Sequence, residues 1–159
     1  MREYHQLTEF RLNPMPVETH YVDMGKGAHK RAHGILTSTD LLVTGLTQAR
    51  DVENTKKLKY MIYDCTDVTE VHTGHEVMAQ LVEINRKTAE VSPGGLIAIV
   101  APNPLVFGMA RTWQSLSLDL GWKSQIFHER AAAIAWLRKQ LGGGDPESPA
   151  LEEYPSLKA

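Results

Sequence analysis

The sequence predicts an α/β domain with a mostly parallel five-stranded sheet, an N-terminal hairpin and about four helices. Short apolar runs alternate with stretches of helical periodicity from residue 37 to residue 141, a pattern typical of strand, helix, strand units with right-handed crossovers. The clearest unit is the unbroken apolar run 96–101, which is bounded by glycine and proline. Such a run favours a strand that is covered on both faces of the sheet.

Residues 17–35 predict the hairpin. Two strands, 17–24 and 28–35, flank a glycine-containing turn, and the first should lie antiparallel at or near an edge of the sheet. Alternation along the second strand separates two sets of side chains, with Ala28, Lys30 and Ala32 on one face and His29, Arg31 and His33 on the other. The second set is basic, so we expect its face to lie outside the core.

Two helices and a strand are predicted in the middle of the chain. Residues 37–40 supply hydroxyl caps and an early acid for the first helix, and a strand follows over 58–65. Residues 66–71 read as a polar loop. Thr73 and Glu76 then match a capping box, which predicts that Thr73 caps the second helix.

The run 96–101 leads directly into a third helix. Asn103 can cap this helix, and Pro104 suits its first position because the missing N–H would have no partner there in any case. Gly121 is a plausible stop for this unit. A strand over 122–127 and a helix over 129–141 complete the prediction.

A single domain accounts for the chain. Its 159 residues, 42% hydrophobic and 23% charged, fit one core. We expect residues 1–16 to form an N-terminal arm on the surface, residues 17–141 the domain, and residues 142–159 a flexible tail with three prolines and four acids.

Composition narrows the function classes. A formal net charge of -2 argues against a nucleic-acid partner. No run approaches the roughly 18 apolar residues of a membrane span, and no apolar stretch of a secretory signal follows Met1, so we expect a cytoplasmic protein without an integral membrane segment. The single cysteine, Cys65, excludes an internal disulfide and fits a reducing compartment.

The carboxyl ends of parallel strands are where ligands tend to bind, here around residues 64–73 and 102–104. Unpaired N–H groups at the starts of the two following helices could hold an anion in that crevice. The candidate ligand-binding residues are Asp64, Thr73, Pro102, Asn103, Phe107 and Arg111.

The densest cluster of potential metal ligands is formed by His72 and His75, with Asp64, Cys65 and Asp67 a few residues upstream. Neutral imidazole, thiolate and carboxylate are zinc donors, although the spacing here matches no established zinc pattern. The candidate metal ligands are His72, His75 and Cys65. Cys65 with one of these histidines could instead form a nucleophile and base pair. A lone cysteine at a strand end is more often a small buried hydrophobe. We therefore assign no catalytic residue, expect no cofactor, and treat a Cys/His hydrolase as a minority hypothesis.

The only concentrated basic patch is formed by Lys26, His29, Lys30, Arg31 and His33. It could meet an acidic partner or a phospholipid head group. A solvated strand face is the commoner explanation for such a run.

Three consecutive segments resemble a known family. The helix start Val106-Phe107-Gly108-Met109-Ala110-Arg111 follows the apolar strand 97–100, and the segment 127–137 runs from Phe-His-Glu-Arg to Ala-Trp-Leu. This pattern looks like the SpoIIAA-like STAS/SEC14-type domain family, and residues 34–42 and 60–68 suit its earlier elements. The likeness covers roughly residues 17 to 141, and its motifs are mostly packing signatures that identify a fold better than a chemistry.

The resemblance implies a compact cytosolic domain whose relatives are largely without a demonstrated reaction. Related STAS domains are regulators that are switched by phosphorylation of a serine at a helix start, within an aspartate-serine-serine-glycine motif. Residues 72–75 match that place, with Gly74 in the position of the switch serine and Thr73 keeping a hydroxyl. Thr73 is therefore the candidate phosphorylation site.

We accordingly expect a non-catalytic regulatory or protein-interaction module. The alternative is a protein that holds a small apolar, lipid-like or anionic ligand. An edge strand and an exposed helix face would also permit a homodimer.

Overall fold

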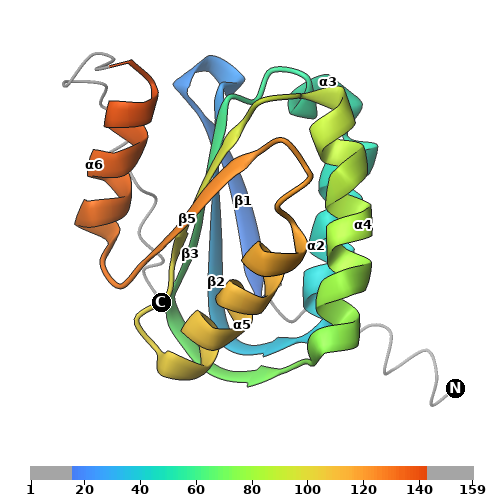
Figure 1. Ribbon diagram of the computed structural model, residues 1–159, viewed down its shortest axis with the longest axis vertical. Coiled ribbons are helices and arrows are strands. Elements are labelled where there is room, and N and C mark those ends of the chain that lie inside the picture. The colour runs from blue at the N-terminus through green and yellow to red at the C-terminus, as the bar shows by residue number, and fades with distance from the viewer. Residues whose placement is uncertain (1–15, 143–159) are drawn as a thin grey trace, which may run out of the picture.

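The computed structural model describes residues 16–142, which form one five-stranded sheet with helices on both faces (Figure 1). The strands are β1 (Val17–Val22), β2 (Gly27–Thr37), β3 (Tyr60–His72), β4 (Leu96–Val100) and β5 (Lys123–Phe127). They lie side by side in chain order. β1 pairs antiparallel with β2 at one edge, and the other three pairs are parallel. This arrangement confirms the predicted sheet and hairpin.

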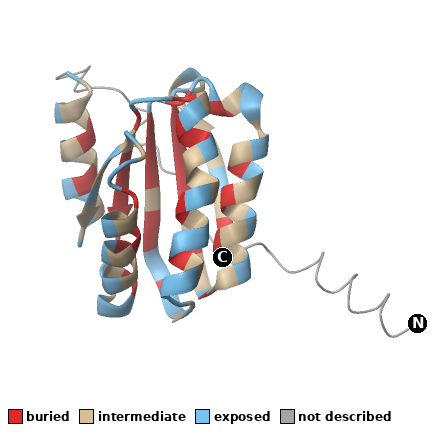
Figure 2. Cartoon of the chain, turned by 45° about the vertical axis from the view of Figure 1, so that its right-hand side comes forward, coloured by how far each residue is buried: buried red, intermediate tan, exposed pale blue. Residues whose placement is uncertain are grey.

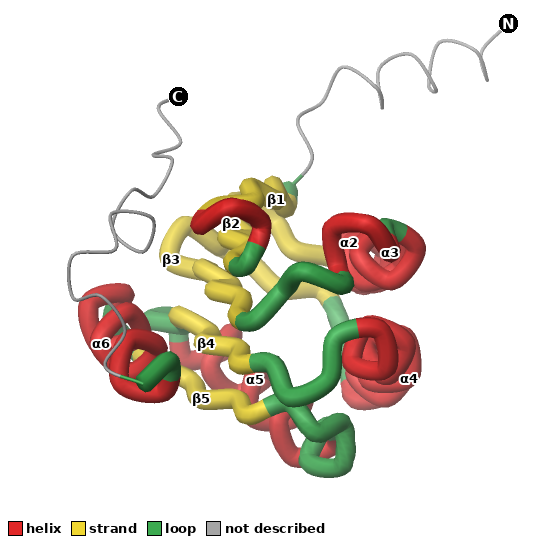
Figure 3. The backbone as a smooth tube through the Cα atoms, turned by 90° about the horizontal axis from the view of Figure 1, so that it is seen from above, coloured by secondary structure: helices red, strands yellow, loops and turns green. Residues whose placement is uncertain are grey.

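The helices are α2 (Ser38–Arg50), α3 (Val52–Thr55), α4 (His75–Val91), α5 (Pro104–Leu116) and α6 (Arg130–Gln140). A 3-10 turn, η1 (Asp23–Gly25), joins the hairpin strands. Seen from above, α2, α4 and α5 cover one face of the sheet and α6 covers the other (Figure 3). The four expected helices are present, and the short α3 occupies a polar stretch that was not expected to be helical.

Two apolar clusters hold these layers together. On the face of α2, α4 and α5, sheet residues such as Met61 and Ile97 pack with Trp113 of α5. On the opposite face, Val100 packs with Leu137 of α6. Because β4 alternates between the two clusters, it is buried on both faces, as predicted for the run 96–101. Figure 2 shows that buried residues are concentrated on the sheet and on the helix faces that meet it.

Two of the three predicted helix caps form. Thr37 Oγ1 accepts from the Asp40 N–H at 3.2 Å, and Asp40 Oδ2 accepts in return from the Thr37 N–H at 2.9 Å. Asn103 Oδ1 accepts from the Leu105 N–H at 2.9 Å, with Pro104 at the first helical position.

The predicted cap of α4 is wrong. Gly74 holds the cap position, and no side chain caps this helix start. Thr73 lies one residue outside, where its Oγ1 accepts from Ser38 Oγ at 3.0 Å. The Thr73 hydroxyl, which the local pattern predicts as a helix cap, instead bonds to Ser38 and links the starts of α2 and α4.

The predicted loop over 66–71 is also wrong, because β3 continues to His72. Asp64 is the last β3 residue paired with β4, and the rest of the strand pairs only with the long strand β2, as far as Thr37 opposite His72. The β2 ladder satisfies the backbone of this polar stretch, and Val68 anchors it in the core.

The expected arm (1–16) and tail (142–159) lie outside the described residues except for Pro16 and Gly142. Among the helices of residues 16–142, none combines the length and apolar character that a membrane crossing requires.

Candidate functional site

The start of α5, where we expect a crevice, lies at the carboxyl edge of the sheet. Pro102 is exposed and Asn103 is half-buried, with its side-chain oxygen taken up by the helix cap. Leu105, in the first turn of α5, leaves 71% of its surface exposed. This edge therefore exposes the apolar side chain of Leu105, and the side-chain oxygen of Asn103 is already used by the helix cap.

Phe107 and Arg111 lie one turn apart on α5. The Phe107 ring stacks on the ring of His128 in the loop before α6, with centroids 4.5 Å apart and planes inclined by 6°. Arg111 is exposed. The Phe107 ring is thus already engaged in packing, whereas the Arg111 guanidinium is accessible to a partner.

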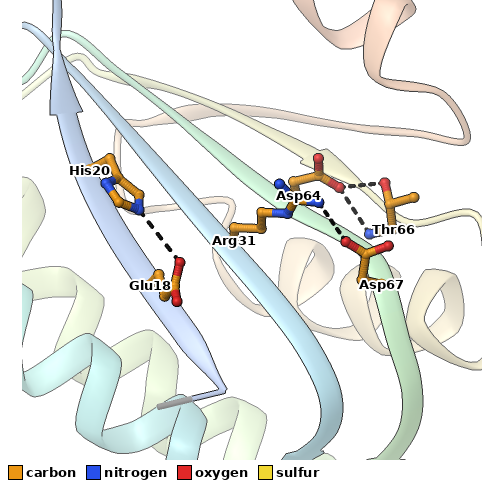
Figure 4. Close-up of polar contacts among 6 residues, drawn as sticks. All are labelled: Glu18, His20, Arg31, Asp64, Thr66 and Asp67. Carbon is orange, nitrogen blue, oxygen red and sulfur yellow. Dashed lines mark hydrogen bonds and ion pairs between the residues drawn. The ribbon is translucent and has the colours of Figure 1, made fainter. Parts of the chain in front are cut away.

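Asp64 belongs to the other face of the sheet, the one that α6 partly covers. It is buried, and its Oδ1 accepts from the Thr66 N–H at 2.9 Å and from the Thr66 hydroxyl (Figure 4). These bonds link residues two positions apart within β3. Asp64 is therefore engaged within its own strand, while Thr73 lies at the far end of β3 and bonds to α2.

The same sheet face carries an ion pair between β2 and β3 and a contact between a histidine ring and a carboxylate within β1. Arg31 Nη2 of β2 lies 2.7 Å from Asp67 Oδ2 of β3, and His20 Nε2 lies 3.5 Å from Glu18 Oε2 within β1 (Figure 4). Opposite charges facing each other on adjacent strands stabilise a sheet modestly. The pairing of β2 with β3 therefore accounts for the contact between Arg31 and Asp67.

The expected basic patch is not one surface. The alternation along β2 is as predicted, but His29 is only 1% exposed, contrary to the expectation that its face lies outside the core. Burial, with the positive charge of Arg130, lowers the pKa of His29 to about 4, so the ring is neutral at pH 7. Lys30 points to the opposite face and is also buried.

Cys65 is a buried core residue. Burial, aided by the charge of Asp64, raises its pKa to about 12, so the thiol stays protonated at neutral pH. This is the opposite of what a catalytic thiolate needs. The expectation that Cys65 is a small hydrophobic residue of the core is confirmed.

The candidate metal ligands are dispersed. His72 is exposed and its Nε2 lies 3.0 Å from Glu70 Oε2, and His75 is exposed at the start of α4. Within residues 16–142, no three His, Cys, Asp or Glu side chains converge on a point that could hold a metal ion.

Thr73 and Ser38 form a junction that the sequence did not reveal. Ser38 Oγ lies 3.0 Å from Thr73 Oγ1 and 3.3 Å from the His72 carbonyl oxygen, linking the starts of α2 and α4. The ends of β2 and β3 are in register, with Thr37 opposite His72, so the residues that follow each strand meet. A prediction that β2 and β3 pair in parallel as far as Thr37 and His72 would also have predicted this contact.

Comparisons with known proteins identify the fold. No protein-family model matches the chain, and a search of curated proteins finds no significant relative. Among solved structures, the chain is similar to the anti-sigma factor antagonist SpoIIAA in its unphosphorylated form, with a TM-score of 0.50 and 12% sequence identity. The match covers 77% of this chain and 97% of that one. The chain therefore has the SpoIIAA-like fold that the motifs between residues 97 and 137 predicted.

Proposed function

We propose that this domain is a non-catalytic regulatory module of the STAS type that acts by binding a protein partner. The observation that carries the proposal is the match to nearly the full length of SpoIIAA, whose description is that of an anti-sigma factor antagonist. The protonated, buried Cys65 and the dispersed histidines favour a binding role over a catalytic one.

The surface proposed for the partner is the carboxyl edge of the sheet. Ile35, near the end of β2, is 48% exposed, and Leu105 is more exposed still. Polar and charged side chains, including His72 and Arg111, lie exposed at the strand end and along α5. Exposed apolar side chains within a polar rim are typical of protein interfaces.

Phosphorylation of Thr73 is the proposed means of regulation. Its hydroxyl accepts a hydrogen bond from Ser38, and the start of α4 beside it has no side-chain cap. A phosphate there would add about two negative charges next to the positive end of the α4 dipole and would alter the Ser38 contact. The surface at the carboxyl edge would then change in charge without unfolding of the domain.

Site-specific photo-crosslinking in the source cells tests the proposal. A photoreactive amino acid at Leu105 should capture one dominant protein, whereas the same residue at Leu118 should not. Leu118 is a matched control because it is 79% exposed and follows the opposite end of α5. Equal capture at both positions, or none at Leu105, would overturn the proposed surface.

Reconstitution with the purified captured protein completes the test. Leu105→Asp should weaken its binding at least tenfold, whereas Leu118→Asp should leave binding within about twofold of the wild type. Thr73→Glu should change the affinity and Thr73→Val should not, if a negative charge is the regulatory event. Unchanged binding by both Thr73 variants would contradict the phosphorylation proposal while leaving the partner proposal standing.

A further inference from the structure

A partly open cavity of about 110 Å³ lies between the sheet and the layer formed by α2, α4 and α5. Its walls are mainly apolar and include Met61 of β3, Met78 of α4 and Met109 of α5. Protein interiors are normally packed with few voids larger than a water molecule, and an engineered apolar cavity of roughly 150 Å³ in another protein takes up benzene. This cavity is large enough for a small organic molecule.

Lys30 lines this cavity and has no ion-pair partner among the described residues. It is 5% exposed, and the hydrogen bond that its Nζ makes is to Thr19 Oγ1 at 3.2 Å. Asp51 attracts the ammonium but lies beyond ion-pair distance. A lysine ammonium carries three donors, and lysine is almost never fully buried without a counter-charge.

Gln48 of α2 and Thr88 of α4 also line the cavity. Their buried side-chain oxygens, Gln48 Oε1 and Thr88 Oγ1, lack hydrogen-bond partners within the described chain. Unsatisfied buried polar atoms are rare in native proteins and often mark a position filled by water or ligand. The wall of the cavity is almost entirely apolar, and Lys30 is the one charged residue of the described chain that lines it. An apolar pocket with few polar groups is the usual composition of a ligand site.

We propose that the cavity binds a small monocarboxylic acid of about four to six carbons, whose carboxylate pairs with Lys30 while its chain fills the apolar space. The charge of Lys30 selects the acid over neutral or cationic molecules of the same length. The cavity volume limits the chain length. Burial lowers the pKa of Lys30 to about 8, which leaves it mostly charged at pH 7 and able to pair with a carboxylate. This site is independent of the partner surface at Leu105.

Methionine methyl signals provide a direct test with the full-length protein. Met61, Met78 and Met109 line the cavity, and Met24 in the hairpin turn is 94% exposed and serves as an internal control. In protein labelled with ¹³C at the methionine methyls, pentanoate should shift the three cavity signals in a saturable way and leave Met24 unchanged. The neutral isostere pentanamide should bind at least tenfold more weakly.

The variant Lys30→Met separates charge recognition from cavity size. It should weaken pentanoate binding at least tenfold and change pentanamide binding less than twofold, because the apolar space is retained. Ala110→Leu, which adds volume to the wall, should abolish the binding of both. Absence of saturable shifts in the cavity signals, as for a chamber that holds only water, would overturn the proposal. So would equal pentanoate affinity in the Lys30→Met protein.

Discussion

The buried ammonium of Lys30 makes the stability of the domain depend on pH. Its pKa falls from 10.5 in the unfolded chain to about 8 in the folded protein, so the unfolded chain binds this proton more tightly. Between these two values the free energy of unfolding rises with pH as the folded protein loses its buried charge. Below pH 8 the buried charge of Lys30 lowers the free energy of unfolding by its full amount, which the size of this pKa shift puts at up to about 3 kcal/mol.

Replacing this side chain by an uncharged one of similar length should therefore stabilise the protein at neutral pH. We expect Lys30→Met to raise the free energy of unfolding at pH 7 by about 1–3 kcal/mol, and the advantage should shrink towards pH 10. Urea unfolding of both proteins at the two pH values measures it. The control Lys26→Met removes an exposed charge and should change stability by less than about 0.5 kcal/mol at either pH. A destabilised Lys30→Met at pH 7 would contradict this account.

At the scale of single residues, alternation along β2 correctly placed Lys30 on the face of Ala28 and Ala32. The same lysine was nevertheless grouped with His29 and Arg31 as a basic patch, because those residues are neighbours in the chain. Two-residue periodicity fixes the direction of a side chain but not what covers it. The burial of Lys30 and His29 depends on tertiary packing, which no local pattern reveals.

Two glycines, one just before β4 and one inside α5, have opposite roles. A Cβ on Gly95, just before β4, would lie 2.4 Å from Trp122 Cε2, and this indole is held by its Nε1 donating to the Ser92 carbonyl at 2.7 Å. A Cβ on Gly108 within α5 would meet no other atom within 4 Å. The first glycine is required by close packing, whereas the second only lowers the helix propensity of α5.

We expect Gly95→Ala to lower the free energy of unfolding by at least about 2 kcal/mol, because a fixed ring must move. Gly108→Ala should raise it by about 0.5–1 kcal/mol. Thermal and urea unfolding of the two single-methyl variants measure both changes. Similar effects of the two substitutions would show that the Trp122 contact is not a packing constraint.

Elements whose ends are determined locally were predicted closely. The cap at Asn103 with Pro104 fixes the start of α5 within a few consecutive residues. The start of α4 was misassigned because Thr73 has a long-range partner in Ser38, and the length of β3 was missed because its polar half is stabilised by pairing with β2. Both errors concern residues whose partners lie more than 30 positions away in the sequence.

At the scale of the whole molecule, α6 is the only helix of the described chain on its face of the sheet, yet it shares β4 with the rest of the core. Leu137 of α6 is fully buried against β3 and β4. Because β4 contributes to both apolar clusters, we expect the two faces to unfold together.

Leu137→Ala should lower the free energy of unfolding by about 2–5 kcal/mol while keeping a single transition. Leu118→Ala, at a 79% exposed position, should change it by less than about 0.5 kcal/mol. Circular dichroism and tryptophan fluorescence recorded during the same urea titration provide two probes. Separate transitions for the two probes would show that α6 is an independent unit.

The predicted fold class holds for the whole molecule because alternating strands and helices leave few ways to form a sheet. The candidate site was harder to predict from the sequence than the fold. The expected crevice near Asn103 comes from a general rule about strand ends and stays a prediction. The cavity beside Lys30 lies between the sheet and three helices from different parts of the chain. A void of that kind has no local sequence pattern.

The strands lie in the sheet in the order in which the ribosome makes them. Each new strand therefore pairs with the one synthesised immediately before it, and no early strand must wait for a partner from the far end of the chain. Connections between sequential neighbours keep the entropy of loop closure low. During translation, the sheet can grow from β1 to β5 by adding one strand at a time, with α6 closing the second face last.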